Sequence, residues 1–481
     1  MFPLSTRQLA ELFSAAALAG QPEGSPEDLP VTGCGIDSRQ LQPGDVFFAC
    51  RGQRQHGIEY AAAALAAGAV CVVTDQRPAA SPDSSPALLR RTLLVPDTTA
   101  ALQQVARWNR SQSAAAVIGI TGSVGKTSTR QLITAVLQAR LRGLQSAANY
   151  NNELGVPLTL LRLSSGDQFV AVEMGAGRCG DIRLLCDLAR PTAAVVTRVA
   201  PCHLESFGTL AEVARTKAEL PASLAADGTA FLNADDPRVQ AMSAETEARV
   251  VYFGERAAGS SRLTGVTAAN GRCRFFCGSD EFSFCGGRQL VVCAAAAVAV
   301  GREWGLSAAE IQRGLSTFQP GPGRGGVFRG QFWTLIDETY NCSPASLSAS
   351  IAGMASWKGS RRVLVAGDML ELGAETAALH RQTAALLAGS AVDLAVFVGA
   401  YADVCRDAAV AAGFPHSRTQ AYAEVPELST ALPDLLRSGD VVLLKGSRGL
   451  RLERVFNRLR ELNGSAGLFD GEFHRGTGSE H

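Results

Sequence analysis

The sequence of 481 residues lacks an excess of charge of either sign, because 45 Lys and Arg residues balance 45 Asp and Glu residues. A balanced chain has no basic field that would attract nucleic acid or an anionic membrane surface. The sequence also lacks a long apolar run: LVVCAAAAVAV at 290–300 is too short to cross a bilayer and predicts a buried helix. We therefore expect no nucleic-acid partner and no stable membrane insertion.

Targeting and metal-binding patterns are missing as well. The first twenty residues, MFPLSTRQLAELFSAAALAG, have no basic stretch followed by an apolar block, so they predict an amphipathic helix and not a signal peptide. The twelve cysteines show no paired spacing, and Cys273 and Cys277 have no His or Cys partners at zinc-site distance. Free thiols suit a reducing compartment. These patterns predict a cytoplasmic protein.

A chain of this length is too long for a single core and predicts about three domains. Residues 1–113 carry short β-like runs and Ala-rich helical runs, with a loop expected at 78–87. Residues 114–319 carry continuous apolar runs at 115–120, 169–174, 193–199 and 228–233. Residues 320–481 repeat this alternation of strands and helices, and end in a tail (464–481) that we expect to be loose. Continuous apolar strands alternating with helices predict an α/β fold with parallel sheets.

The stretch GITGSVGKTST at 119–129 lies between an apolar run and a helical pattern. This order predicts a phosphate-binding loop, in which the lysine contacts the β- and γ-phosphates and the next hydroxyl contacts Mg²⁺. The usual pattern has glycine where this sequence has Ile120. The alternative is a glycine-rich turn with a surface lysine. The expected nucleotide-binding residues are Thr121, Gly122, Ser123, Val124, Gly125, Lys126, Thr127 and Ser128.

Other polar residues follow at the predicted carboxyl ends of neighbouring strands. Glu173 ends the run FVAVEM, and His203 comes just after AAVVTRV. Ligands bind at this edge of parallel sheets, so Glu173 is a candidate Mg²⁺ contact and His203 a candidate metal or substrate contact. A salt bridge and a structural histidine are the alternatives. Lys217 and Glu219 follow on a predicted helix, where a lysine is usually a solvated charge.

The motifs taken together resemble a known family. TGSVGKTST, NYNNELGVP (149–157), EMGAG (173–177), HLESFGT (203–209), ARTKAEL (214–220) and LNADDP (232–237) are similar in order and spacing to the Mur ligase superfamily. Its members are ATP-dependent, amide-forming enzymes of peptidoglycan assembly, and their shorter loop, TGSxGKT, matches the glycine spacing here. The resemblance implies a UDP-binding amino-terminal domain, a central ATPase domain and a Rossmann-like carboxyl-terminal domain.

The last block resembles one branch of the superfamily. DETYNCSPAS (337–346) is similar to a D-D-x-Y-N-A-N-P-x-S segment, and GDMLELG (367–373), the following His380 and LLKGSRGLRLE (443–453) are typical of the ligases that add D-alanyl-D-alanine. The D-N-P-R and K-G-H-E motifs of the diaminopimelate- or lysine-adding branch are absent. The resemblance implies that D-Ala-D-Ala is joined to UDP-MurNAc-tripeptide through an acyl phosphate. It does not distinguish diaminopimelate from lysine as the tripeptide's third residue.

The resemblance also implies roles for the central residues. Lys126 and the loop amides would hold the phosphates of ATP, and Thr127 with Glu173 would bind one Mg²⁺. His203 would help to bind a second Mg²⁺. Lys217 matches a lysine that is carbamylated by CO₂ in several members of the family. The two residues that would lie near the reacting carboxylate are Asn151 and Asn152.

Residues of the two outer blocks match substrate-binding positions of the family. In the first block, GCGIDSRQLQPGDVFFACRG (33–52) would bind UDP through Ser38 and Arg39. In the third block, Arg324 and Asp337 would reach ATP, and a hinge at 320–326 would let this domain close. The residues implied for the second substrate are Tyr340, Asn341, Ser343 and Lys445.

The sequence departs from the family at several positions. In the G-x-H-N-x-x-N segment beside adenine, Gln289 replaces histidine, and Leu290 and Cys293 replace the two asparagines. Gln289 can still form hydrogen bonds and is an expected nucleotide-binding residue, whereas Leu290 and Cys293 can only pack. Arg198 replaces an asparagine, and RQHGIEY (54–60) lacks the usual D-G-H. Another superfamily ligase of the diaminopimelate, folylpolyglutamate or cyanophycin type, a phosphate-loop NTPase switch and a degenerate homologue are the alternatives. We expect a monomer.

Overall fold

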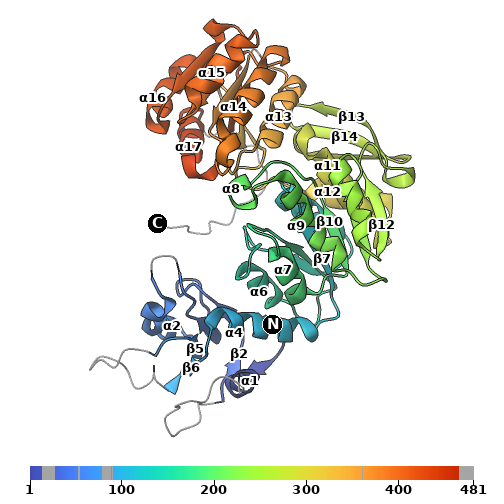
Figure 1. Ribbon diagram of the computed structural model, residues 1–481, viewed down its shortest axis with the longest axis vertical. Coiled ribbons are helices and arrows are strands. Elements are labelled where there is room, and N and C mark those ends of the chain that lie inside the picture. Colours follow the sequence, from blue (N-terminus) through green and yellow to red (C-terminus); the bar gives the residue numbers. More distant parts are fainter. Residues whose placement is uncertain (14–27, 53–54, 78–87, 89, 360, 465–481) are drawn as a thin grey trace.

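The amino-terminal lobe is built on a small parallel sheet (Figure 1). The computed structural model describes residues 1–13, 28–52, 55–77, 88, 90–359 and 361–464. The strands lie in the order β3 (Gly33–Gly35), β4 (Asp45–Phe48), β5 (Cys71–Thr74) and β6 (Thr92–Leu94). The same lobe contains β1 (Leu4–Ser5), β2 (Pro30–Val31), α1 (Thr6–Leu12), α2 (Ala61–Ala66) and α4 (Thr98–Ser111).

Helix α4 joins this lobe to the central one. Its buried Asn109 donates through Nδ2 to the carbonyls of Leu160 and Leu163, at 2.9 and 3.2 Å, in the central lobe. The same side chain accepts from Phe2 N at 2.9 Å through Oδ1. Leu102 and Val105 on α4 belong to the apolar core that continues into the central domain. The two lobes therefore share one core beneath this helix.

The central lobe contains an entirely parallel six-stranded sheet. The order is β12 (Arg249–Phe253), β11 (Thr229–Asn233), β10 (Ala193–Val196), β7 (Ala116–Thr121), β9 (Phe169–Glu173) and β8 (Gly143–Gln145). Its helices are α5 (Lys126–Leu137), α6 (Gly155–Leu160), α7 (Asp181–Ala189), α8 (Leu204–Phe207), α9 (Leu210–Ala222), α10 (Pro237–Ala241), α11 (Val291–Glu303) and α12 (Ala308–Thr317).

Both faces of this sheet are covered, which explains the continuous apolar strands. Successive side chains of a strand point to opposite faces. Val117 accordingly belongs to the core with α6, α7 and α9, whereas Ile118 belongs to the core with α5, α11 and α12. The predicted parallel sheet is confirmed. The predicted strand 193–199 was too long, because β10 ends at Val196. The next residue, Thr197, donates its hydroxyl to the carbonyl of Val124 in the loop at 2.6 Å.

A second, antiparallel sheet in the central lobe was not predicted. It consists of β13 (Leu263–Ala269), β14 (Arg272–Cys277) and β15 (Asp280–Cys285). Buried and exposed residues alternate strictly along β14, as expected for a sheet with one solvated face. The turn at Asn270 reaches the carboxyl-terminal lobe, where Asn270 Oδ1 accepts from Lys358 N at 3.0 Å.

The carboxyl-terminal lobe has a six-stranded sheet in which one edge strand is antiparallel. The order is β16 (Gly326–Arg329), β17 (Thr334–Glu338), β21 (Val441–Lys445), β18 (Arg362–Gly367), β19 (Leu394–Val398) and β20 (Thr419–Tyr422). Its helices are α13 (Pro344–Gly353), α14 (Thr376–Ala385), α15 (Ala402–Ala411), α16 (Val425–Leu435) and α17 (Glu453–Leu462). The three-domain α/β fold is thus confirmed.

The ends of the chain differ from the sequence prediction or lie outside it. The expected amino-terminal helix begins only at Thr6, because Ser5 pairs with β2 and caps α1 by accepting from Gln8 N. Residues 14–27, the predicted loop at 78–87 and residues 465–481 of the predicted tail lie outside the described residues. No helix in the described part of the chain is long and apolar enough to cross a membrane.

Candidate active site

The glycine-rich loop connects β7 to α5 and folds against the end of β10. Gly122 has a φ of 141°, and a Cβ there would lie 2.0 Å from Thr197 Oγ1, so only glycine fits. Gly125 begins α5 in the left-handed region, with a φ of 87°. Lys126 Nζ donates to the carbonyl of Gly122 at 2.7 Å, across the loop. The free backbone N–H groups of a helix start and this ammonium can bind phosphate together.

The carboxylate of Glu173 lies behind this loop at the end of β9 and is only 3% exposed. Its Oε2 accepts from Thr127 Oγ1 at 2.7 Å, and its Oε1 accepts from Asn151 Nδ2 at 3.0 Å. The structure thus brings together three residues that the sequence placed in one site. A hydroxyl and a carboxylate are hard oxygen ligands of the kind that Mg²⁺ takes, together with several waters and phosphate oxygens.

Arg130 completes this cluster and was missed in the sequence. It lies one turn after Lys126 on α5 and is buried, with Nε 3.9 Å from Glu173 Oε2. Its Nη1 donates to the carbonyls of Ser146 and Ala148. Burial lowers the pKa of its guanidinium, and the charge of Glu173 opposes that shift. The signal was available, because residues at i and i+4 share a helix face.

Lys217 and Glu219 have separate surroundings. Lys217 is buried at 2% exposure, and its Nζ lies 5.9 Å from the Phe207 ring centre. Burial, with the charge of nearby Lys126 adding to it, lowers the pKa of the Lys217 amine to about 8. Glu219 instead accepts from the backbone N of Gly180 and Arg183, at 2.7 and 2.9 Å, at the start of α7. Lys217 is thus a buried amine, whereas the Glu219 carboxylate accepts from backbone N–H groups at the start of α7.

His203 meets the carboxyl-terminal lobe. It begins α8 with a φ of 50°, and its Nδ1 pairs with Oε2 of Glu371, whose own φ is 64°. Two non-glycine residues in the left-handed region thus face each other between the lobes, and such strain is concentrated at functional sites. Glu371 was not singled out in the sequence, although it lies in the GDMLELG segment.

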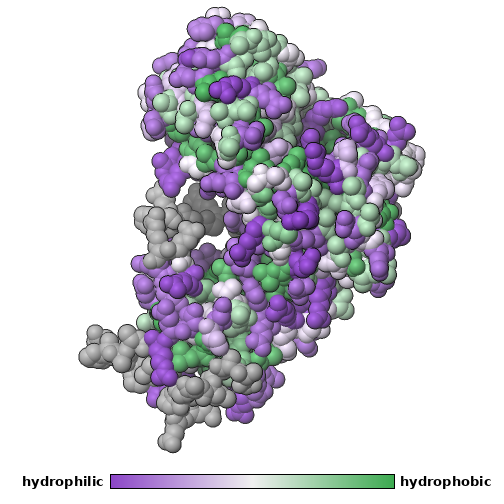
Figure 2. Space-filling view, in the orientation of Figure 1, coloured by the Kyte–Doolittle hydropathy of each residue, from purple (hydrophilic) through white to green (hydrophobic). Residues whose placement is uncertain are grey.

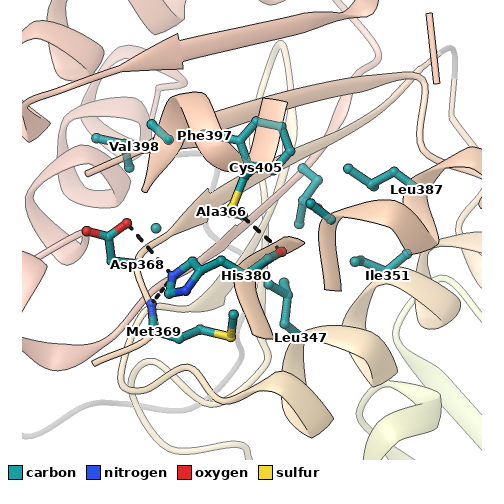
Figure 3. A pocket seen from close by; sticks show the side chains of 14 residues that line it. Leu347, Ile351, Ala366, Asp368, Met369, His380, Leu387, Phe397, Val398 and Cys405 are labelled. Carbon is teal, nitrogen blue, oxygen red and sulfur yellow. Dashed lines mark hydrogen bonds and ion pairs between the residues drawn. The ribbon is translucent and has the colours of Figure 1, made fainter. Parts of the chain in front are cut away.

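His380 fixes the backbone of the segment 367–373, which contains Glu371, beside a small apolar cavity (Figure 3). His380 Nε2 accepts from Met369 N at 3.0 Å, and Nδ1 is 2.7 Å from the carbonyl of Thr376. A proton on Nδ1 satisfies both contacts, so the ring is neutral here. Asp368 accepts from the backbone N of Ala400 at 2.7 Å and holds the other side of the segment.

Acidification is expected to destabilise this region through His380. Burial lowers the pKa of His380 below its usual value near 6.5. The unfolded chain therefore binds the proton more readily, and the stability that neutral His380 contributes is present above about pH 6.5 and is lost as the pH falls through the lower folded value. In urea titrations at pH 7.5, 6.5 and 5.5, we expect the unfolding free energy to fall less for His380→Gln than for the natural chain. Equal pH slopes would contradict the role of His380.

The hinge segment wraps over the end of β17. Gly323 N donates to Asp337 Oδ2 at 2.9 Å, and the φ of Gly323 is 71°. The guanidinium of Arg324 lies 3.8 Å from the centre of the Tyr340 ring. Asp337 also accepts from the Thr339 hydroxyl at 2.6 Å. Arg324, Asp337 and Tyr340 thus come together in this structure, and their contacts with ATP or the second substrate stay predictions.

The remaining third-block residues gather at the ends of β17 and β21. Lys445 Nζ pairs with Glu338 Oε2 at 3.0 Å and donates to the carbonyl of Asn341 at 3.3 Å. Ser343 caps α13 by accepting from Ser346 N. Glu338 was missed in the sequence, although it directly follows Asp337.

The residues that differ from the family pattern beside the expected adenine site make specific contacts in this structure. Gln289 Nε2 donates to Glu338 Oε1 at 2.7 Å, so it contacts the carboxyl-terminal lobe. Cys293 is buried with Sγ 3.8 Å from the carbonyl of Gly125, and Leu290 is buried in the core beneath. Arg198 is exposed, and its carbonyl accepts from Ser123 N at 2.6 Å.

The predicted residues Asn152, Ser38 and Arg39 lie in loops. Asn152 Oδ1 accepts from the backbone N of Gly155, the first residue of α6, at 2.9 Å. Arg39 follows β3, is exposed, and pairs with Asp37 at 2.9 Å; Ser38 is its half-buried neighbour. Their substrate roles stay predictions. Within the described residues no group of three or more His, Cys, Asp or Glu side chains could hold a metal. The Mg²⁺ contacts expected of Thr127 and Glu173 stay predictions.

Comparison with known proteins gives a consistent result along the chain. Residues 30–110 match the model of the Mur ligase family catalytic domain, residues 120–292 the Mur ligase middle domain, and residues 323–448 the Mur ligase glutamate ligase domain. The UDP-N-acetylmuramoyl-tripeptide–D-alanyl-D-alanine ligase of Escherichia coli K12 is 32% identical over 473 residues, covering 96% of this chain and 99% of that protein.

Solved structures agree with this result. MurF from Acinetobacter baumannii superposes with a TM-score of 0.83 at 26% identity, covering 95% of this chain and 99% of that one. MurF ligase from Thermotoga maritima, solved in complex with ADP, superposes with a TM-score of 0.76 at 26% identity, covering 89% and 97%.

Proposed function

The chain belongs to the Mur ligase family, and from this premise we propose that it is the ATP-dependent ligase that joins D-alanyl-D-alanine to UDP-N-acetylmuramoyl-tripeptide. The product would be UDP-MurNAc-pentapeptide for peptidoglycan synthesis. The observation that carries the proposal is the likeness over 96% of the chain to a ligase of that name. The third-block segments around Tyr340 and Lys445 support the choice of amino substrate.

The chemistry that this function requires begins with activation of a carboxylate. The tripeptide carboxylate attacks the γ-phosphorus of ATP, the bond to the β-phosphate oxygen breaks, and ADP leaves. The neutral amine of D-Ala-D-Ala then attacks the acyl phosphate, phosphate leaves with the bonding electrons, and the nitrogen loses a proton. Such a reaction depends mainly on positioning and on the neutralisation of charge.

The central residues would hold the phosphates. Lys126, which lies across the loop on the carbonyl of Gly122, and the N–H groups at the start of α5 would bind the β- and γ-phosphates. Thr127 and Glu173 would hold Mg²⁺, with His203 contributing to a second ion; the metal supplies charge neutralisation at the transferred phosphoryl group. Asn151 would keep Glu173 oriented through its 3.0 Å hydrogen bond.

Lys217 is proposed to carry a carbamate. A neutral amine reacts with CO₂ to form an N–C bond and releases a proton, so the cation becomes a carboxylate. Its burial and the nearby charge of Lys126 favour the neutral amine. An uncharged or anionic side chain at this place would not repel the metal.

The outer lobes would bind the two substrates. We assign Ser38 and Arg39 to UDP, Arg324 and Asp337 to ATP, and Tyr340, Asn341, Ser343 and Lys445 to the dipeptide. We also propose that the UDP-binding domain ends at residue 113 and that the central ATP-binding domain ends at residue 319. The enzyme would work as a monomer in the cytoplasm, where ATP is supplied.

The test is a phosphate-release assay with purified protein, Mg-ATP and UDP-MurNAc-tripeptide, with and without D-Ala-D-Ala. We expect release only when both substrates are present, and a pentapeptide product by mass spectrometry. Diaminopimelate, lysine and glutamate serve as competing amino acceptors. Turnover with one of these acceptors would identify another ligase of the family, and turnover without any acceptor would favour an NTPase switch.

A further inference from the structure

A buried carboxylate, Glu338, connects residues of two lobes. It ends β17 and is 5% exposed, and both of its oxygens have partners. Oε1 accepts from Gln289 Nε2 of the central lobe at 2.7 Å. Oε2 pairs with Lys445 Nζ at 3.0 Å and also accepts from Ser350 Oγ, both in its own lobe. A carboxylate removed from water needs all of these contacts.

On the carboxyl-terminal side, Glu338 holds the segment assigned to the second substrate. Lys445 stands opposite Glu338 in the neighbouring parallel strand and is 6% exposed. The same ammonium donates to the carbonyl of Asn341 at 3.3 Å. Glu338 therefore fixes the position of Lys445 and, through it, the backbone next to Tyr340.

On the central side, Gln289 is attached to the phosphate loop. It lies in the short helix η4 (Arg288–Leu290), directly before α11. One turn later on α11, Cys293 Sγ contacts the carbonyl of Gly125 at 3.8 Å. Helix α11 also packs along α5, the helix that Lys126 begins. A displacement of the loop or of α5 would therefore move α11 and, with it, the side chain of Gln289.

The Gln289–Glu338 bond lies beside the hinge. A Cβ on Gly325, in the hinge, would be 3.6 Å from Gln289 Nε2, and one on Gly353, at the end of α13, would be 3.6 Å from Gln289 Oε1. Because Gln289 and Glu338 belong to different lobes, a change in how the two lobes are arranged would change the distance between them.

We propose that Glu338 is a positioning residue that couples nucleotide binding in the central lobe to dipeptide binding in the carboxyl-terminal lobe, through Gln289 on one side and Lys445 on the other. This inference rests on the proposed function. When Gln289 contacts Glu338, as in this structure, both oxygens of the Glu338 carboxylate have partners. A nucleotide that fixes α5 and α11 would favour this arrangement of the two lobes. Coupling of this kind is reciprocal, so each ligand should tighten the binding of the other.

The experiment measures the affinity of D-Ala-D-Ala by calorimetry, with and without Mg-AMP-PNP, in the presence of UDP-MurNAc-tripeptide. For the natural chain we expect the nucleotide analogue to tighten dipeptide binding by about 5- to 150-fold, the usual range for coupled sites. Gln289→Met removes the donor without adding charge, and Gln289→Glu places two carboxylates together. Both variants should reduce the ratio to near one, and the affinity of each variant for the analogue alone, measured beside it, sets the analogue concentration that saturates the site.

The exchanged double variant Gln289→Glu/Glu338→Gln is the rescue. Its amide and carboxylate can restore the bond between the lobes, with donor and acceptor reversed, so the nucleotide effect on dipeptide binding should return. The amide oxygen that Glu338→Gln introduces can still accept from Lys445 Nζ, so the contact persists, but without the ion pair the dipeptide affinity itself should stay weakened. A merely structural role for Glu338 would not separate these two quantities.

The possible outcomes are distinct. A natural ratio near one, Gln289 variants that keep the natural ratio, or a double variant that stays uncoupled would each overturn the coupling. A natural chain that binds AMP-PNP but no dipeptide under any condition would contradict the proposed function instead. Thermal melts of every variant check folding, and Gln289→Met serves if the charged variants fail to fold.

Discussion

Replacing Lys126 with alanine is expected to lower D-Ala-D-Ala-dependent phosphate release on the order of 100- to 1,000-fold, the usual effect of removing one preorganised group that stabilises developing charge. The ammonium is held across the loop by the carbonyl of Gly122 at 2.7 Å. It is therefore in place before the nucleotide binds. The loss should appear mainly in kcat, because the transferred phosphoryl group gathers its charge in the transition state.

A matched control is available in the same chain. Lys358 is an exposed lysine whose backbone N–H contacts Asn270, so Lys358→Ala makes the same charge change outside the phosphate loop. It should leave phosphate release within about twofold, as is usual for surface substitutions. A Lys126→Ala variant that folds normally and keeps its activity would remove the loop from the mechanism and favour the glycine-rich turn.

The sequence predicted the parts of this site that lie in one stretch of chain. The strand, the loop and α5 follow one another, and Glu173 comes directly after an apolar run, so their meeting at one sheet edge follows from parallel topology. The fold class was predictable for the same reason. Both faces of the two large sheets are covered, and this leaves continuous apolar runs in the sequence.

The sequence could not predict which side chains would meet between lobes. Gln289 and Glu338 are 49 residues apart, and His203 and Glu371 come from different lobes, so no local periodicity connects them. Lys217 and Glu219 are close in sequence but do not share an environment in the fold. They are two residues apart on one helix, and this spacing sends them to different neighbours. The antiparallel sheet was missed because its short strands alternate without long apolar runs.

The second large effect is expected at Lys217. Lys217→Ala should lower phosphate release on the order of 100-fold, because it removes the group that we propose becomes a charged carbamate near the metal. Lys217→Arg keeps a cation that cannot form a carbamate, and it should be equally inactive. Lys217→Glu supplies a carboxylate at nearly the same place and should retain more activity than either. This order of activities separates a required anion from a required cation.

Removal of CO₂ tests the modification itself. Because the pKa of the Lys217 amine is lowered to about 8, chiefly by burial, roughly half of an unmodified amine is neutral at pH 8 and able to react. The natural enzyme, held in CO₂-free buffer at this pH, should lose activity and regain it when bicarbonate is added, with a carbamate signal from ¹³CO₂ by NMR. Lys217→Glu should respond to neither treatment. Full activity of the natural enzyme with no carbamate signal would mean that the unmodified amine of Lys217 is sufficient. In that case Lys217→Arg should be more active than Lys217→Glu.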